Sequence, residues 1–333
     1  MIRIILGAAS LLCSISASAG AAAELTHFQV PGANATTIWA MNETGETAGR
    51  YLTDDGRWHG FVRHGDGTFA KFDPSASAID MNVKGMNAAG IVIGDYSPSE
   101  NVTHGFLRKA GGKILTIDVP NSADTFPAAI NDKGAVAGVY VDQTSGRARS
   151  FIRSAKGQYT TFDEPDAETL TAASVMNDKG TVAGTFRDGD GAHLFVRSRK
   201  GEFKRFDIAG SFNVTALGMN AKGAITGIYE DGHAHGHGFV LARNGTLSLF
   251  DPPGASQTSP RAINDGGTVA GDFSIDGEGT QNHGFLRAAD GTITLFDYPG
   301  SDTTYIRAIS NGGVIAGYYA NNIGSFRGFY GVP

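Results

Sequence analysis

A single pattern recurs seven times along this chain of 333 residues, at a spacing of about 45 residues. Each copy contains the tripeptide Gly-x-aromatic and, further along the same copy, a Phe. The glycines are Gly49, Gly94, Gly138, Gly184, Gly227, Gly271 and Gly317. The phenylalanines are Phe61, Phe106, Phe151, Phe195, Phe239, Phe285 and Phe329. A fixed period of this length indicates one supersecondary unit that cannot bury its apolar face alone and must stack on its neighbours.

Each unit contains four short runs that alternate apolar residues with polar or small ones, which is typical of strands. In the sixth unit these runs are Pro260–Ile263, Thr268–Phe273, His283–Arg287 and Thr292–Phe296. No segment shows a sustained period of 3.6 residues, so we expect almost no helix. Four strands in a unit of this length predict an all-β fold, a seven-bladed β-propeller of four-stranded blades.

The two ends of the chain predict how the ring closes. The last unit stops at Gly328–Pro333 without a fourth strand, and the N-terminal run Leu25–Gly32 aligns with the fourth-strand segment Leu295–Gly300. The N-terminal strand therefore completes the last blade and leaves no unpaired edge there. We accordingly expect residues 24–333 to form one seven-bladed propeller domain.

Small residues predict which strand of the unit lies innermost. They stand two positions before the Asn of the first-strand turn, which is Ser310 in the last unit, at Ala40, Gly85, Ala129, Gly218, Ala262 and Ala308. Small side chains suit the crowded centre of a ring, so we expect the first strand to be the inner one.

Residues 1–23 have the pattern of a secretory signal peptide. Arg3 is followed by the apolar run Ile4–Ile15, which is shorter than the roughly 20 residues that span a bilayer. Ala17-Ser18-Ala19 and Ala21-Ala22-Ala23 both offer small-x-small cleavage sites. The sole cysteine, Cys13, lies inside this segment, so the mature chain would hold no disulfide. We expect a protein that is secreted or periplasmic after removal of this segment, without a membrane span.

The pattern from Asn-x-x-Gly through His-Gly-Phe to Phe-Asp-x-Pro resembles the bacterial extracellular HAF-repeat family over residues 25–333. His-Gly-Phe begins at His59, His104, His237 and His283, whereas the other units read Arg-Ser-Phe, His-Leu-Phe and Arg-Gly-Phe. The resemblance implies a secreted repeat protein with propeller-like blades. It implies no established activity and no catalytic residue.

Residues that recur in the units are expected to be structural. The Asn of each first-strand turn, such as Asn264, precedes a Gly by three positions and predicts a tight hairpin. We interpret the repeated His, such as His283, as a strut between strands, and the repeated Asp, such as Asp297, as an acceptor of backbone N–H groups. A ring of calcium ligands is the alternative for the aspartates. The Arg two positions after the Phe, such as Arg287, is expected to pair with carboxylates on the rim.

Residues that vary between units are the candidates for function. The positions three and five before the Asn lie on one side of the first strand, because they are two residues apart. If this strand is innermost, they line the mouth of the channel, and aromatic rings beside cations suit sugars or anionic ligands. The predicted ligand-binding residues are Trp39, Lys84, Phe126, Arg261, Tyr305 and Arg307. Variable packing between blades is the alternative. Since Arg261 and Arg307 lie outside the repeated framework, we expect their replacement by Ala to leave the melting temperature unchanged.

The run His233, His235 and His237 suggests a metal site, for zinc or calcium. On a strand, all three imidazoles would point the same way. Because His237 is also the repeated His of its unit, a strut is the alternative for that residue. We otherwise expect no cofactor.

Charge and motifs exclude several classes of protein. The net charge of -6 and the lack of a basic stripe argue against nucleic acid as a partner. The chain contains no Gly-x-Ser-x-Gly, His-Glu-x-x-His or phosphate-binding Gly-Lys-Ser/Thr motif. Scattered carboxylates at a channel mouth would escape such a search, so catalysis stays open. We expect a monomer.

The turns define two faces of the predicted ring. The turns after the first and third strands, 264–267 and 288–291 in the sixth unit, are uniform and form the hairpin face. The connections after the second and fourth strands, such as 274–282, vary and form the loop face, the usual place for binding on a rigid scaffold. The sequence therefore predicts a secreted, non-catalytic propeller that binds a glycan or a protein through its loop face. The alternative is a hydrolase or lyase that acts on sugars or lactones at the channel mouth, with or without a metal.

Overall fold

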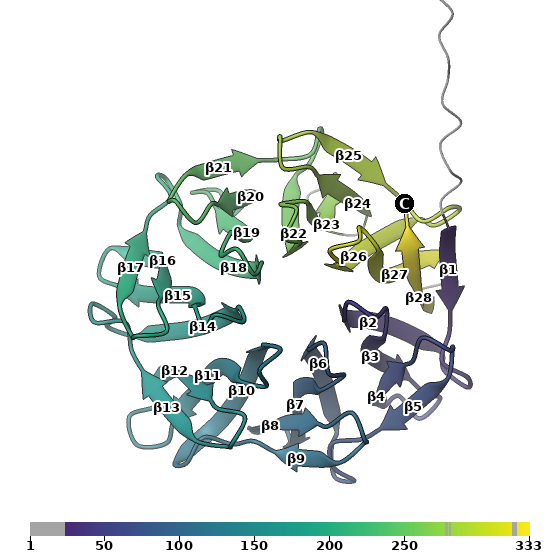
Figure 1. Ribbon diagram of the computed structural model, residues 1–333, viewed down its shortest axis with the longest axis horizontal. Helices are drawn as coiled ribbons and strands as arrows, with labels where there is room; N and C mark the ends of the chain where they lie inside the picture. Colours follow the sequence, from purple (N-terminus) through teal and green to yellow (C-terminus); the bar gives the residue numbers. More distant parts are fainter. Residues whose placement is uncertain (1–23, 277–278, 280, 322–324) are drawn as a thin grey trace, which may run out of the picture.

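The computed structural model describes residues 24–276, 279, 281–321 and 325–333. Within these residues every regular element is a β-strand, and the strands surround a central axis (Figure 1). The described part of the chain contains no helix, and hence none that could cross a membrane. The all-β fold and the propeller of four-stranded blades that the sequence predicts are confirmed. The predicted signal peptide, 1–23, and Cys13 lie outside the described residues.

Five units of the repeat each have a four-stranded antiparallel sheet of their own. The first sheet is β2 (Ala35–Met41), β3 (Thr47–Leu52), β4 (Trp58–Arg63) and β5 (Phe69–Phe72). The second is β6 (Asp80–Met86), β7 (Val92–Ser99), β8 (Val102–Arg108) and β9 (Ile114–Thr116). The fifth is β18 (Asn213–Met219), β19 (Ile225–Glu230), β20 (Gly236–Leu241) and β21 (Leu247–Phe250). The sixth is β22 (Gln257–Ile263), β23 (Val269–Ser274), β24 (Asn282–Arg287) and β25 (Ile293–Phe296).

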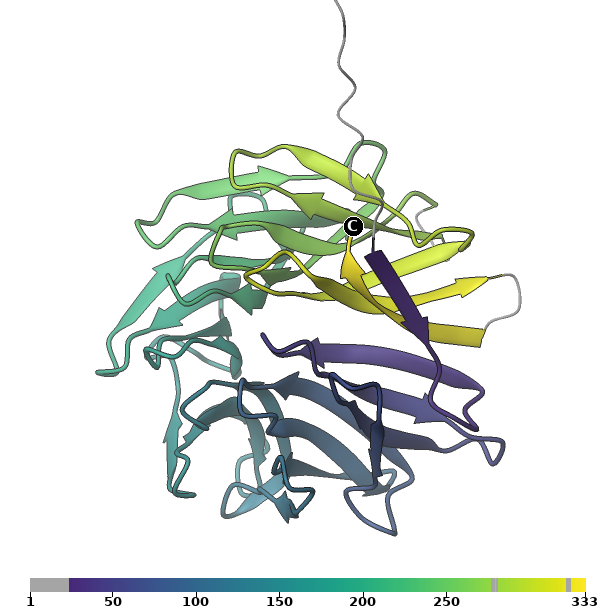
Figure 2. The same ribbon diagram turned by 45° about the vertical axis from the view of Figure 1, so that its right-hand side comes forward.

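The seventh unit closes with the N-terminal strand, as predicted. Its sheet runs β26 (Thr303–Ile309), β27 (Ile315–Asn321), β28 (Ser325–Val332) and then β1 (Glu24–Phe28). Strand β1 pairs antiparallel with β28, from Glu24 opposite Val332 to Phe28 opposite Gly328. Figures 1 and 2 show β1 and β28 side by side in this sheet.

The expectation of seven separate blades is not met, because the third and fourth units share one eight-stranded sheet. It contains β10 (Ser122–Ile130), β11 (Val136–Asp142), β12 (Ala148–Arg153), β13 (Tyr159–Phe162), β14 (Leu170–Met176), β15 (Val182–Asp188), β16 (Gly191–Arg197) and β17 (Phe203–Phe206). A parallel bridge between Ala148 and Leu170 joins the halves. Ser150, which replaces the Gly of His-Gly-Phe, strengthens the junction, since its hydroxyl donates to Thr171 O and accepts from Ala173 N at 2.9 and 2.8 Å.

The first strand of each unit lies innermost, as the small residues predict (Figure 1). Each inner strand contacts the inner strands of the units on either side, and β26 contacts β2, so the contacts run round the whole ring. The core lies between neighbouring sheets, where the Phe of every repeat is fully buried. One cluster, for example, joins Val62 of β4 to Met81 and Val83 of β6.

Hydrogen bonds between the inner hairpins link the units on the hairpin face. The Asn87 side chain donates to Asn131 O at 3.1 Å, and Asn131, Asn220 and Asn264 repeat this bond to the next unit. Backbone N–H groups form a second series, in which Asp265 N donates to Asn311 Oδ1 at 2.8 Å and Asn311 N donates to the carboxylate of Glu43, at 3.1 and 3.2 Å to its two oxygens. The repeated Asn thus forms its own turn and joins that turn to its neighbour.

Candidate functional site

Every inner strand carries a β-bulge at the position that varies between the units. The extra residues in the register are Trp39, Lys84, Ala128, Ser174, Leu217, Arg261 and Arg307. A bulge bends a strand and redirects a side chain. The repeated Gly is needed here, because a Cβ on Gly49 would overlap the carbonyl oxygen of Thr37, and the same overlap arises in all seven units.

Three of the predicted channel residues meet at the junction of β26 and β2. The Arg307 guanidinium carbon lies 4.9 Å from the ring centroid of Trp39 and 5.2 Å from that of Tyr305. Tyr318 of β27 adds a third ring at 5.1 Å, and its hydroxyl accepts a 2.7 Å hydrogen bond from Arg307. The rings of Tyr305 and Tyr318 stack at 4.8 Å. Residues from both ends of the chain therefore enclose one cation.

Asp272 of β23 supplies the counter-charge for this cation. Its Oδ1 lies 3.1 Å from Nη1 of Arg307 and 3.3 Å from Nε of Arg261. The side chains of Asp272 and Arg307 are only 4% and 7% exposed, whereas that of Arg261 is 31% exposed. Burial raises the pKa of the Tyr318 hydroxyl, so this phenol stays neutral. The buried pair forms the base of the site, and Arg261 lies nearer its opening.

A second set of polar side chains continues round the ring into β6 and β7. The Arg50 guanidinium lies 6.0 Å from the Trp39 ring and donates to Asn82 Oδ1 at 2.7 Å. Asn82 in turn donates to Asp95 at 2.8 Å, and Asp95 lies 3.4 Å from the ammonium of Lys84. Burial lowers the pKa of Arg50. The side chain of Lys84 is 43% exposed and is therefore open to a ligand.

We call these residues the channel cluster: Trp39, Arg50, Asn82, Lys84, Asp95, Arg261, Asp272, Tyr305, Arg307 and Tyr318. The structure brings five of the six predicted residues into it. The sixth, Phe126, is 37% exposed on β10 and has no described contact with the cluster. Sequence reasoning missed Arg50, Asp95, Asp272 and Tyr318, which all follow the repeated Gly. Their variation from unit to unit was the available signal.

The repeated His forms a strut to the repeated Asp, in agreement with the structural interpretation of the His. The Asp mainly accepts from this side chain, and in the described residues only Asp118 accepts a backbone N–H, from Gly105 at 3.1 Å. Nδ1 of the His on the third strand lies 2.6–2.9 Å from the Asp that follows the fourth strand. The pairs are His59–Asp73, His104–Asp118, His193–Asp207, His237–Asp251 and His283–Asp297. In the third unit Arg149 replaces the His and binds Asp163 at 2.8 Å.

The expectation that the repeated Arg pairs with carboxylates at the rim is wrong, since none of these arginines forms an ion pair within the described residues. Arg108 donates to Lys109 O at 3.4 Å and lies 5.2 Å from the ring of Phe72 in the preceding unit. Arg197 and Arg287 lie over aromatic rings in the same way. Burial lowers the pKa of each of these three guanidinium groups. Their planar heads fill space between sheets rather than pair at the rim.

The predicted metal site at His233, His235 and His237 is not formed. Only His237 belongs to a strand, β20, while His233 and His235 lie in a turn in which Ala234 has a φ of 61°. His237 is committed to Asp251, and its Nε2 lies 3.6 Å from Asp231. Among the described residues no group of three His, Cys, Asp or Glu side chains is placed to hold a metal ion.

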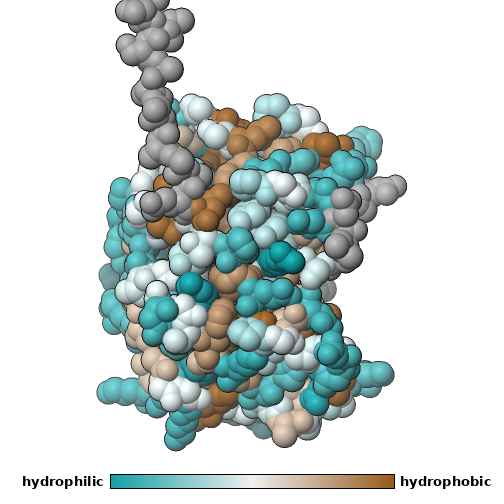
Figure 3. Space-filling view, turned by 90° about the vertical axis from the view of Figure 1, so that its right-hand side faces the viewer, coloured by the Kyte–Doolittle hydropathy of each residue, from teal (hydrophilic) through white to brown (hydrophobic). Residues whose placement is uncertain are grey.

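Carboxylates on the loop face largely shape their own turns. Asp142 accepts backbone N–H bonds from Thr144 and Ser145, and Asp188 accepts them from Asp190 and Gly191. Because these turns differ in sequence and length between units, the loop face has a different loop at each unit. The outer side of the ring, seen in Figure 3, shows apolar patches separated by polar residues.

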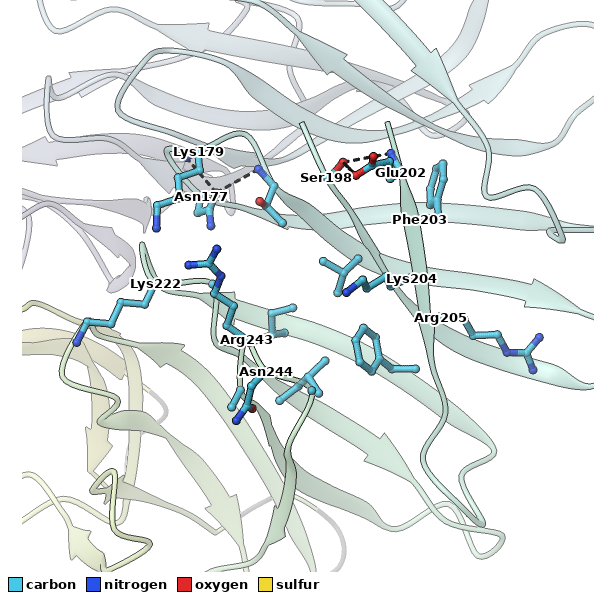
Figure 4. A pocket seen from close by; sticks show the side chains of 18 residues that line it. Asn177, Lys179, Ser198, Glu202, Phe203, Lys204, Arg205, Lys222, Arg243 and Asn244 are labelled. Atoms are coloured by element: carbon cyan, nitrogen blue, oxygen red, sulfur yellow. Dashed lines mark hydrogen bonds between the residues drawn. The ribbon is translucent and has the colours of Figure 1, made fainter. Parts of the chain in front are cut away.

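A groove of about 790 Å³ opens on the hairpin face between the fourth and fifth units (Figure 4). Its floor contains Val196, Phe206, Ile225 and Leu241. Lys179, Lys204, Lys222 and Arg243 line it, and Figure 4 shows Lys179, Lys222 and Arg243 gathered toward one end. The sequence did not point to this groove, because each turn by itself looks like part of the uniform framework.

Comparison with solved structures defines the class of protein, a β-propeller. A streptogramin B lyase matches with a TM-score of 0.61 at 13% identity, covering 92% of this chain and 96% of its own. Virginiamycin B lyase from Staphylococcus aureus matches with 0.59 at 14%, covering 93% and 99%. A puromycin hydrolase matches with 0.61 at 11%, covering 90% of this chain and 53% of its own. At these identities the likeness shows the fold alone. No protein-family model and no curated protein matches the chain.

Proposed function

We propose that the protein is a secreted, non-catalytic propeller that binds an extracellular or periplasmic partner through its loop face, with the channel cluster as the binding site. A glycan is the partner that the chemistry of the cluster suits best. The observation that carries the proposal is the buried pair of Arg307 and Asp272 under three aromatic rings. A buried ion pair is costly to form and contributes little stability over apolar packing. The third to fifth units have Ala128, Ser174 and Leu217 at the same position, so the repeat does not require it.

The accessible part of the cluster has the groups that bind sugars. Lys84 and Arg261 offer charged donors, and the rings of Trp39 and Tyr305, which lie over the Arg307 guanidinium, belong to the same cluster. Hydroxyl groups of a sugar accept and donate hydrogen bonds, while its C–H faces pack on aromatic rings. The network beneath holds these side chains in place, which lowers the entropy lost on binding.

Two further proposals concern the class of protein. We propose that β10–β13 and β14–β17 act as two blades, which makes seven in all, because each half repeats the strand pairing of the other sheets. We also propose that the chain belongs with the extracellular HAF-repeat proteins and acts as a monomer.

The proposal that the protein is exported has its own test. Analysis of the N-terminus and mass of protein recovered from the periplasm or medium would show whether residues 1–23 are removed.

A glycan array with purified residues 24–333 tests the binding proposal. We expect binding to a defined glycan that the double variant Lys84→Ala, Arg261→Ala loses. The single variant Lys113→Ala, on the hairpin face of the second unit, is the control and should bind like the parent. Equal binding by the double variant and the parent would refute the channel cluster as the site.

A hydrolase or lyase at the channel mouth is the second candidate, since the cluster contains the carboxylates Asp95 and Asp272. Both carboxylates are paired with cations. The repeated histidines do not contact these carboxylates, because each bonds to the Asp that follows the fourth strand of its own unit. We therefore expect no turnover of lactones or glycosides, with or without added zinc or calcium. Turnover that Asp272→Asn abolishes would replace the binding proposal with this one.

A further inference from the structure

Cations without partners line the groove between the fourth and fifth units. Among the described residues, the side chains of Lys179, Lys204, Lys222 and Arg243 make no ion pair and no hydrogen bond. Glu202 is the only carboxylate that lines the groove, and it accepts a bond from Ser198. The groove therefore concentrates positive charge above an apolar floor.

A second groove of about 330 Å³ continues this surface between the third and fourth units. Lys179 lines both grooves, and Lys133 and Arg199 line the second. Asp178 also lines it, and its carboxylate accepts the backbone N–H of Asp132 at 2.7 Å. The two grooves thus form one track across three consecutive units, which we call the cation track: Lys133, Lys179, Arg199, Lys204, Lys222 and Arg243.

The repeat itself does not require these cations. Lysine stands two positions after the turn residue only in the third, fourth and fifth units, where the other units have Thr44, Ala89, Gly266 and Gly312. Arginine stands four positions after the repeated Phe only in the fourth and fifth units. Arg199 and Arg243 lie over the turn glycines Gly180 and Gly223 of their own units, which places each Arg beside a Lys. The charges therefore cluster on three neighbouring units of a protein that is acidic overall.

We propose that the cation track binds a linear anionic polysaccharide that carries carboxylate or sulfate groups. Guanidinium groups bind such anions through two parallel hydrogen bonds, and ammonium groups bind them as point charges. The apolar floor suits the C–H faces of sugar rings. Asp132, Asp178 and Glu202 lie along the same surface, and the net charge is -6, so a densely charged nucleic acid is the poorer fit. The two grooves share no residue with the channel cluster, so this proposal does not depend on that site.

Titration calorimetry of residues 24–333 with polygalacturonate and with dextran sulfate tests the proposal, with neutral dextran as the reference. We expect binding to at least one polyanion and none to neutral dextran. The triple variant Lys179→Ala, Lys222→Ala, Arg243→Ala should bind roughly tenfold more weakly or worse, and added salt should weaken binding by the parent.

The matched control is the triple variant Lys113→Ala, Lys156→Ala, Lys200→Ala. It removes the same charge from the same face outside the two grooves, and it should bind like the parent. Equal weakening in both triple variants would show that binding depends on net charge alone, and this result would overturn the proposal. Failure of the parent to bind either polyanion would also overturn it. If duplex DNA bound more tightly than both polysaccharides, the proposal of a polysaccharide ligand would be refuted. The double variant Lys84→Ala, Arg261→Ala should keep this binding, which separates the result from the channel cluster.

Discussion

At the scale of single residues, the same type of side chain has different roles in different surroundings. Arginine in the third strand fills space between sheets, arginine in the cation track is exposed, and Arg307 is buried with Asp272. The sequence could not separate these roles, because they depend on which sheet lies opposite. We therefore replace the expectation that Arg307 is dispensable for stability with the opposite prediction, because its charge and that of Asp272 are both buried.

We predict that Arg307→Ala destabilises the protein by about 2–4 kcal/mol, because it leaves the carboxylate of Asp272 buried with one partner fewer. Arg261 remains close to that carboxylate and limits the loss. Arg261→Ala, which removes a more exposed partner, should cost less than about 1 kcal/mol. Urea unfolding followed by fluorescence measures both changes. Equal stability of the Arg307 variant and the parent would show that Arg261 alone compensates Asp272.

His237 should titrate above the ordinary His value of about 6.5. Burial lowers its pKa, but the carboxylates of Asp251 and Asp231 raise it further, and the net shift is upward. A raised pKa in the folded state adds stability that is fully present below about pH 6.5 and is lost as pH rises through the folded pKa. Histidine NMR titration of the parent and of Asp251→Asn measures this. We expect a lower pKa in the variant, and an unchanged value would rule out Asp251 as the cause.

At the scale of the strand and the sheet, the bulge determines the site. Position −5 from the turn Asn pairs directly with the residue after the repeated Gly, as Tyr305 pairs with Tyr318 and Ser259 with Asp272. This register follows from the extra residue in the inner strand, which no sequence pattern marks. Periodicity was therefore enough to predict the strands and the inner position of Trp39, but not the partners that surround it.

The bulge makes the Gly-x-aromatic glycine irreplaceable, and a pair of glycines in the seventh unit tests this. A Cβ on Gly317 would overlap the carbonyl oxygen of Tyr305, whereas a Cβ on Gly312 would meet only Ser310 Oγ at 3.7 Å. We expect Gly317→Ala to cost about 2 kcal/mol or more and Gly312→Ala to stay within about 0.5 kcal/mol of the parent. Chemical denaturation compares the two. Similar losses at both positions would show that the bulge relaxes to admit a methyl group.

At the scale of the whole molecule, closure joins the two ends of the sequence into one ring. The chain ends predicted the pairing of β1 with β28, because a missing strand at one end matched a spare strand at the other. No sequence pattern indicated that the third and fourth units share a sheet, because one bridge and one serine hydroxyl make that junction. Nor did any pattern indicate the hydrogen bonds that run from hairpin to hairpin and end at Glu43.

Closure by β1 should control the stability of the entire ring. Phe28 packs its ring against Phe61, Phe69 and Tyr330, so β1 ties the seventh sheet to the first. Deleting residues 24–28 removes this packing and exposes the edge of β28. We expect the thermal midpoint to fall by at least about 5 °C and the truncated chain to self-associate. Calorimetry and size-exclusion chromatography measure the two effects, with Thr26→Ala, an exposed position on the same strand, as the control. A monomeric truncation that melts with the parent would mean that contacts between inner strands close the ring without the N-terminal strand.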